Sequence, residues 1–221
     1  MTELRLSSLF EDPLHSAAYH HVMRYEYPWE VIPNIKDIIL EIGQALGEGY
    51  TMTAQDIWVA NDARVAPSAT INGPAIIMSG AEVRPSAYIR GSVLIGRGAV
   101  VGNSTEIKNS ILFDGVQVPH FNYVGDSILG YKSHLGAGAV TSNVKSDKSC
   151  VTVRLDEGKI STGLLKFGAI LADYVEVGCN SVLNPGTIIG RHTSVYPLSL
   201  VRGYIPPHSI LKENGVIVKK R

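Results

Sequence analysis

The 221-residue chain is poor in several residue classes, and each shortage narrows what the protein can be. Its two cysteines, Cys150 and Cys179, lack CxxC spacing, which excludes a disulfide framework and favours a reducing compartment, the cytoplasm. Lys plus Arg equals Asp plus Glu at 20 each, so composition gives no case for nucleic acid or an anionic membrane as a partner. No apolar run reaches the length of a membrane span, and acidic residues near the N-terminus argue against a secretory signal.

What the chain has in abundance is an aliphatic residue at every sixth position. The first series comprises Val65, Ile71, Ile77, Val83, Ile89, Ile95, Val101 and Ile107. The second comprises Leu165, Leu171, Val177, Leu183, Ile189, Val195 and Val201. A small or β-branched residue precedes most members by two positions, and glycine often follows. The period is neither that of a helix nor that of a plain strand.

A period of six predicts a short strand followed by a turn, repeated without slippage. The aliphatic residue and the small residue before it point inward together, because side chains alternate along a strand. Three such strands form a coil of about eighteen residues, and stacked coils share one core. The sequence therefore predicts a mainly β fold, a parallel β-helix of hexapeptide repeats shaped as a triangular prism. A β-sandwich with this spacing by coincidence is a poor alternative.

The pattern divides the chain into three parts. They are an N-terminal extension over 1–56, the prism over 57–203 with a polar excursion at 144–164, and a C-terminal tail over 204–221 that begins before Pro206-Pro207. In the extension, Ile35, Ile38, Ile39, Ile42 and Leu46 follow helical spacing. We expect an amphipathic helix near 34–46 that caps one end of the prism. The excursion carries a short alternating run, which favours a β-hairpin.

The six-residue rhythm is interrupted within VPHFNYVGDSILG, residues 118–130, where His120, Asn122 and Tyr123 lie close together. The element His120-Phe121-Asn122-Tyr123-Val124-Gly125, followed by Gly136-Ala137-Gly138 and Asn143, resembles a known acetyltransferase family. It is the acetyltransferase domain of the bifunctional N-acetylglucosamine-1-phosphate uridyltransferase/glucosamine-1-phosphate acetyltransferase. The C-terminal domain of archaeal sugar-1-phosphate nucleotidylyltransferases is more similar still. The resemblance spans 57–203 and implies a left-handed coil.

The resemblance implies an activity and a set of site residues. The implied reaction transfers an acetyl group from acetyl-CoA, without a metal, to the amine of an amino-sugar phosphate such as glucosamine 1-phosphate, a step in UDP-N-acetylglucosamine biosynthesis. His120 matches the general base and Asn143 a residue near the reacting groups; Arg90, Lys108, Tyr123 and Lys166 match acceptor contacts; Ala137 and Cys179 match the slot for the CoA arm. The family forms a homotrimer whose active sites lie between two chains.

Spacing supports one part of this assignment independently. Arg90 and Lys108 are one coil apart, so they are expected to stack on one face, which suits an anionic phosphate. Each could instead be a solvated surface cation, and His120 alone could be an ordinary surface histidine.

The sequence also departs from the family in three ways. His134 stands where the family usually has asparagine, and it could contact the sugar or alter which sugar fits. The segment before the prism is too short for a uridyltransferase domain, so acyl transfer alone is expected. The excursion is more similar to the archaeal proteins, which leaves the acceptor open.

Two rival functions use the same prism. One is a non-catalytic module for assembly or for binding a sugar phosphate, which would not bind CoA. The other is a γ-class carbonic anhydrase, which needs three histidines around zinc. His120 and His134 lack the HxxxxH spacing expected for that site, which weighs against this second rival.

Overall fold

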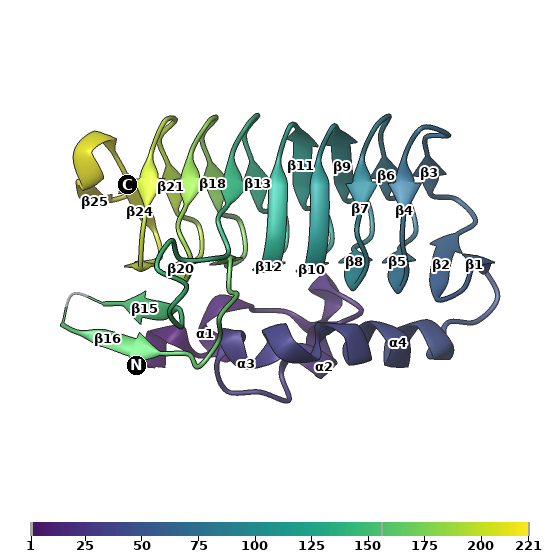
Figure 1. Ribbon diagram of the computed structural model, residues 1–221, viewed down its shortest axis with the longest axis horizontal. Helices are drawn as coiled ribbons and strands as arrows, with labels where there is room; N and C mark the ends of the chain where they lie inside the picture. The colour runs from purple at the N-terminus through teal and green to yellow at the C-terminus, as the bar shows by residue number, and fades with distance from the viewer. Residues whose placement is uncertain (1, 156, 221) are drawn as a thin grey trace.

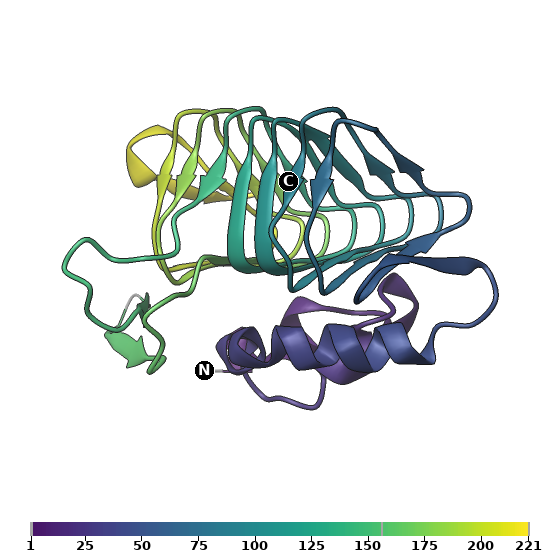
Figure 2. The same cartoon turned by 45° about the vertical axis from the view of Figure 1, so that its right-hand side comes forward.

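The computed structural model of the protein describes residues 2–155 and 157–220. Most of the chain winds into a triangular prism of short parallel strands (Figure 1), so the predicted mainly β, left-handed parallel β-helix is confirmed. The strands lie on three flat faces, which we number in the order in which the chain first enters them. Figure 2 shows the coils stacked along the long axis.

The three faces repeat in the same order along the chain. The first face contains β2 Ile57–Ala60, β5 Ala75–Ile77, β8 Val93–Ile95, the second halves of β10 Glu106–Leu112 and β12 Tyr123–Leu129, β17 Ala169–Leu171, β20 Thr187–Ile189 and β23 Tyr204–Ile205. The second contains β3 Arg64–Val65, β6 Glu82–Val83, β9 Val100–Asn103, β11 Gln117–His120, β13 His134–Leu135, β18 Glu176–Val177, β21 Ser194–Val195 and β24 Ser209–Leu211. The third contains β4 Thr70–Ile71, β7 Tyr88–Ile89, the first halves of β10 and β12, β14 Val140–Thr141, β19 Val182–Leu183 and β22 Leu200–Val201.

The six-residue series forms the inner core of the prism. Ile77, Ile89 and Ile95 are fully buried, and so are the small residues Ala75 and Ala99 that precede members of the series by two positions. Leu165 is an exception: it is exposed, because the chain does not rejoin the prism until Ala169. The rest of the second series points inward from Leu171 onward.

At each end of the prism, one antiparallel strand extends one of the three faces. At the start, β1 (Tyr50–Ala54) pairs with β2. At the other end, β25 (Ile217–Lys219) pairs with β24, so pairing to the prism continues to Leu211. The Pro206-Pro207 pair forms a corner between β23 and β24 instead of ending the prism, because Gly190 leaves room for the Pro207 ring beneath it.

The N-terminal extension is a chain of short helices and turns. The α-helices are α1 Leu6–Leu9, α2 Tyr19–Val22, α3 Pro28–Val31 and α4 Ile35–Ala45; the 3-10 helices are Thr2–Leu4, Pro13–His15 and Ile32–Asn34, with a fourth at Glu213–Gly215 near the C-terminus. Within the described residues, no helix is both long enough and apolar enough to span a membrane.

The outer surface of the first face carries a row of apolar side chains, which we call the apolar ladder. Its members are adjacent in the strand register: Trp58, Ile76, Leu94, Ile111, Ile128, Ile170, Ile188 and Tyr204. The N-terminal extension runs along this face, as Figures 1 and 2 both show. Ile76, Leu94 and Ile111 are consequently fully buried although they point away from the core.

The helix predicted near 34–46 is therefore present as α4, but it lies along a lateral face and does not cap an end. Its apolar side, including Ile35, Ile39 and Ile42, is buried there. The physical reason is that the apolar ladder is a long, continuous apolar surface that needs a cover.

The chain leaves the prism after Thr141 and returns at Ala169. Within this excursion, β15 (Thr152–Arg154) and β16 (Lys159–Ser161) form an antiparallel hairpin. The hairpin is anchored by Val151 and Val153, which are fully buried. Because β12 pairs directly with β17, the stacking of coils continues across the excursion.

A row of stacked aromatic and imidazole rings lines the corner between the first and second faces. The ring of His192 stacks between Tyr174, at 4.7 Å, and His208, at 4.9 Å. Burial lowers the pKa of His192, and the neighbouring His208, Arg191 and Lys220 lower it further. The pKa of His21 in the N-terminal extension is also lowered, chiefly by burial.

We predict that the row makes the protein less stable in mild acid. A histidine whose pKa is lower in the folded than in the unfolded state binds protons preferentially when unfolded, so stability is lost as pH falls below about 6.5. The melting temperature is expected to fall between about pH 7.5 and pH 5.5. His192→Asn, which suits the positive φ of this position, should reduce that fall. An unchanged pH dependence in the variant would contradict the assignment.

A second prediction concerns the contact between α4 and the apolar ladder. A methyl group at Gly43 would overlap the ring of Trp58. Although alanine favours a helix by about 1 kcal/mol over glycine, overpacking costs about 1–3 kcal/mol, so Gly43→Ala is expected to lower the free energy of unfolding. Gly47→Ala is the control, because its methyl group would meet no atom within 4 Å. Denaturant titration measures both, and equal effects would contradict the contact.

Candidate functional site

The six-residue period of the prism changes in two successive coils, in both cases at the corner between the third face and the first. This corner carries part of the candidate site. Steps of six continue through Val118 and Val124, both of which are buried, so the predicted interruption at 118–130 is only partly correct. The actual change is a step of five from Ile107 to Leu112 and again from Val124 to Leu129. As a result, β10 and β12 run continuously from the third face onto the first, with Asn109 and Asp126 at positive φ where they bend.

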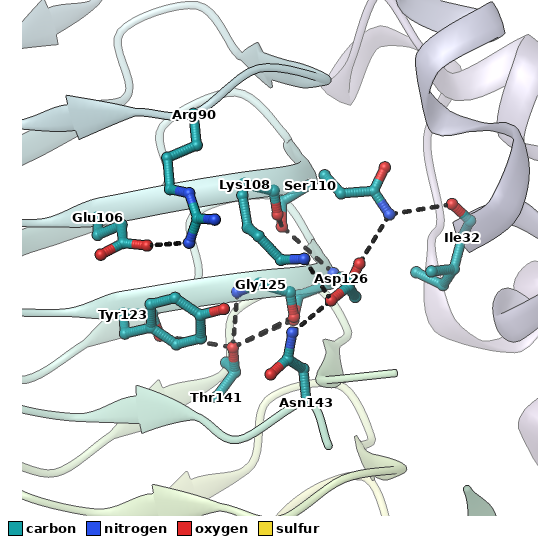
Figure 3. Close-up of polar contacts among 12 residues, drawn as sticks. Ile32, Arg90, Glu106, Lys108, Ser110, Tyr123, Gly125, Asp126, Thr141 and Asn143 are labelled. Carbon is teal, nitrogen blue, oxygen red and sulfur yellow. Dashed lines mark hydrogen bonds and ion pairs between the residues drawn. The ribbon is translucent and has the colours of Figure 1, made fainter. Parts of the chain in front are cut away.

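Asp126 is the centre of a polar cluster at this corner (Figure 3). Its carboxylate is almost fully buried and forms an ion pair with Lys108, with Nζ 3.2 Å from Oδ2. The Asn109 amide donates to Asp126 Oδ1 at 2.9 Å, and the Asn143 amide donates to Oδ2. Asn109 also donates to the carbonyl of Ile32 at 3.2 Å, which joins the cluster to the N-terminal extension.

The outer surface of the third face carries the predicted acceptor contacts. Arg90 follows Ile89, and its backbone N–H donates to the carbonyl of Ile107, so Arg90 and Lys108 lie on neighbouring strands as their spacing predicted. Both cations are already paired, however, since Arg90 Nη1 lies 2.6 Å from Glu106 Oε1. The positive charges of Arg90 and Lys108 are therefore balanced by two carboxylates, Glu106 and Asp126.

Tyr123, at the start of β12, also lies on the third face, and β10 separates it from Arg90. Its hydroxyl sits over Gly125, where a Cβ atom would be only 2.5 Å from the oxygen, so the tyrosine requires glycine two residues later. Burial raises the pKa of Tyr123, and the carboxylates of Asp126 and Glu106 raise it further. The phenol is therefore neutral at pH 7 and can donate a hydrogen bond.

His120 lies at the corner between the second and third faces, at the edge of the third face opposite Asp126. Its side chain is exposed, while its backbone is fixed on both sides: its N–H donates to Asn122 Oδ1 at 3.1 Å, and its carbonyl accepts from Gly138. Asn122 is buried, and its amide donates to the carbonyls of Gly136 and Ala139. The corner therefore fixes the backbone of His120 and leaves its side chain exposed.

Ala137 and Cys179 lie at the same corner as His120, in the next two coils. The carbonyl of Ala137 accepts from Asn180 N–H, and the carbonyl of Cys179 accepts from Leu198 N–H. A Cβ atom at Gly136 would lie 2.6 Å from the backbone nitrogen of Cys179, so the two turns are in direct contact. The three residues form one column along the prism.

The two remaining predicted residues lie in different places. Lys166 is exposed at the end of the excursion, next to Phe167, whose N–H donates to the carbonyl of Asn143. It therefore lies beside the Asp126 cluster. His134 lies on the second face, where Nδ1 is 2.9 Å from Glu176 Oε2, and so points away from the third face. Within the described residues, no three His, Cys, Asp or Glu side chains gather as a possible metal site in one chain.

Sequence reasoning missed Asp126, Asn109 and Glu106. Two signals could have found the first two: each residue lies within a five-residue step, and the two positions are one short coil apart. Glu106 carries no such signal, because it lies outside the five-residue steps and is 16 residues from its partner Arg90.

Comparisons with known proteins found one matching family model and several relatives that match part of the chain. A family model described as the GMPPB C-terminal domain matches residues 71–219. A bifunctional sugar-1-phosphate nucleotidylyltransferase/acetyltransferase of Sulfurisphaera tokodaii is 34% identical over 90 residues, 41% of this chain and 22% of that protein. The bifunctional protein GlmU of Methanococcus vannielii is 34% identical over 111 residues, 50% of this chain and 27% of that protein. The chain thus spans about a quarter of the length of these relatives.

Among solved structures, similarity is weaker. The acetyltransferase domain of PglB from Neisseria gonorrhoeae FA1090, in complex with acetyl coenzyme A, aligns with 81% of this chain and 62% of its own length. Its sequence identity is 16% and its TM-score is 0.28.

The Asp126 cluster leads to a prediction about stability. Asp126→Asn removes the charge that Lys108 requires and places an amide donor against two others, so the free energy of unfolding should fall by about 2–4 kcal/mol. Glu106→Gln is the control: it breaks the more exposed pair with Arg90 and should cost at most about 1 kcal/mol. Chemical denaturation compares them, and an Asp126→Asn protein as stable as the control would contradict the central role of Asp126.

Proposed function

The chain belongs to the family of the GMPPB C-terminal domain, and from this membership and its site we propose that it is a CoA-dependent acyltransferase acting on an amino sugar. The acyl group in this proposal is acetyl, and the acceptor is an amino-sugar phosphate such as glucosamine 1-phosphate. Two relatives, one of them a bifunctional sugar-1-phosphate nucleotidylyltransferase/acetyltransferase, support the class of substrate and reaction.

One observation carries the proposal: the third face lies between a column suited to CoA and a cluster suited to a sugar. The column contains His120, Ala137 and Cys179, and the cluster contains Lys108 and Asn143 around Asp126. In this proposal the pantetheine arm lies extended along the turn backbones of the column. The far edge offers amide and ammonium donors to a polar sugar.

His120 is the general base in this proposal. A neutral imidazole has one ring nitrogen that accepts a proton, so the exposed imidazole of His120 can take the proton that the acceptor amine loses as it attacks the thioester carbon. The new N–C bond forms as the C–S bond breaks, and the proton passes from the imidazole to the departing CoA sulfur. Tyr123, as a neutral phenol, donates to an acceptor oxygen.

A homotrimer completes the site in this proposal. Phe121 and Leu198 lie at the corner that carries His120, and they are 63% and 80% exposed. Leu200, on the third face beside this corner, is 71% exposed. Such an apolar surface suits contact with a second copy of the chain. A neighbouring chain packed there brings its own third-face donors toward His120, which a single chain holds at the opposite edge.

The test is a thiol-release assay with acetyl-CoA against a panel of amino-sugar phosphates, glucosamine 1-phosphate and galactosamine 1-phosphate first. His120→Ala should lower turnover by about 10²–10⁴ with an unchanged native mass by light scattering, because only the base is lost. His20→Ala, at another exposed histidine, is the control and should retain full activity.

Wild-type rates in His120→Ala would overturn the assignment of the base. No thiol release with any acceptor, together with no shift of the melting temperature by CoA, would favour a non-catalytic sugar-phosphate-binding module instead. A zinc content of one per chain would favour the carbonic anhydrase.

A further inference from the structure

We propose that a cleft between the β15–β16 hairpin and the prism binds a phosphate group of one of the two substrates. The inference rests on the proposed function and deepens it, because it assigns a place for phosphate that the motif residues do not provide. The cleft has a volume of about 540 Å³. Among the described residues, its lining includes Lys145, Arg154, Lys159, Arg202 and one carboxylate, Asp147. Figures 1 and 2 show the hairpin lying beside the prism.

The cleft concentrates positive charge in a chain with no net charge. Arg154 and Lys159 are directly opposite each other in the hairpin, so their side chains lie on the same side and repel. Lys145 is paired with Asp147 at 3.4 Å. Among the residues that the structure describes, no carboxylate lies within ion-pair distance of Arg154, Lys159 or Arg202. An anionic ligand would relieve this repulsion.

Backbone contacts hold the hairpin that carries Arg154 and Lys159 against the prism. Gly186 and Gly203 lie at one corner of the prism in successive coils, and the hairpin packs on both. A Cβ atom at Gly203 would lie 2.6 Å from the carbonyl oxygen of Arg154, and one at Gly186 would lie 2.9 Å from that of Thr152. The backbone of Arg154 therefore lies next to Gly203, which follows Arg202, so the two arginines enter the cleft from neighbouring positions.

The predicted phosphate contacts on the third face do not supply the same charge. Arg90 is neutralised by Glu106 at 2.6 Å, and Lys108 by Asp126 at 3.2 Å. The cleft is close to these residues along the chain, since Ser142 lines it while the next residue, Asn143, binds Asp126. A substrate can thus present its sugar or thioester to the third face and its phosphate to the cleft.

The chemistry of the cleft selects phosphate over a simple carboxylate. Two arginines and a lysine around one volume suit a group with several charged oxygens, and guanidinium groups bind phosphate in a bidentate manner. Two sources have this chemistry: the phosphates of CoA, and the phosphate of the amino-sugar acceptor.

The experiment measures binding of inorganic pyrophosphate to the full chain by isothermal titration calorimetry. Arg154→Gln/Arg202→Gln should weaken binding at least tenfold, whereas Arg64→Gln, at an exposed arginine on the second face, should leave it unchanged. The melting temperature without ligand is a second readout, because Arg154→Gln alone should raise it by removing the repulsion with Lys159. Equal pyrophosphate binding by wild type and double variant, or no binding by wild type, overturns the proposal.

Competition and kinetics distinguish the two sources. If CoA supplies the phosphate, adenosine 3′,5′-bisphosphate displaces pyrophosphate, and the double variant raises the KM for acetyl-CoA alone. If the acceptor supplies it, glucosamine 1-phosphate displaces pyrophosphate, and only the acceptor KM rises. Pyrophosphate binding in a protein without acyltransferase activity would sink the proposed function and leave the cleft standing. Acyl transfer without pyrophosphate binding would do the reverse.

Discussion

The structure depends on burial of the apolar ladder on the outside of the first face. A β-helix hides one side of each strand in its core, and its outer side is ordinarily solvated. Here the outer side carries Ile76, Leu94, Ile111 and their neighbours in register from Trp58 to Tyr204. Left uncovered, this row would be a long apolar strip that promotes association. The N-terminal extension covers it, so helix and prism form a single core.

This covering also determines where the polar cluster can form. The extension crosses the corner at which β10 and β12 bend, and the carbonyl of Ile32 accepts from Asn109 there. Asn109 in turn orients Asp126, which holds Lys108 and Asn143. The side chains that face the proposed acceptor are thus fixed by a segment that lies outside the prism and carries none of the motif residues.

Much of the fold could be predicted because the hexad period reports directly on which residues point inward. Val83, Ile89 and Ile95 lie where the period placed them, and Arg90 and Lys108 are neighbours for the same reason. The position of α4 could not be predicted, because helical periodicity identifies an apolar side without saying which surface it meets. A signal did exist, since every third hexad has two consecutive apolar residues, as in Ile76-Ile77 and Leu94-Ile95.

The site was predicted less completely than the fold, because its charges are shared between coils. The family resemblance predicted Lys108, Tyr123 and Asn143 as site residues, but it did not include the carboxylates that pair with the cations. Asp126 acquires its role only when the shortened steps bring three coils and Ile32 to one corner. The cations of the hairpin carry no motif at all and are significant only because Gly186 and Gly203 let the hairpin lie against the prism.

The excursion has a further consequence for how this protein can vary. Ile128 pairs with Ile170, 42 residues later in the sequence, in the same way that neighbouring coils pair elsewhere. The hairpin therefore adds no strand to the stacked faces of the prism. The two ends of the excursion that carries the hairpin meet at the corner of Asp126. There the N–H groups of Phe167 and Gly168 donate to the carbonyls of Asn143 and Asp126. Insertions, deletions and charge changes in the hairpin therefore leave the stacking undisturbed. The scaffold and the surface proposed to bind phosphate can therefore evolve at separate rates.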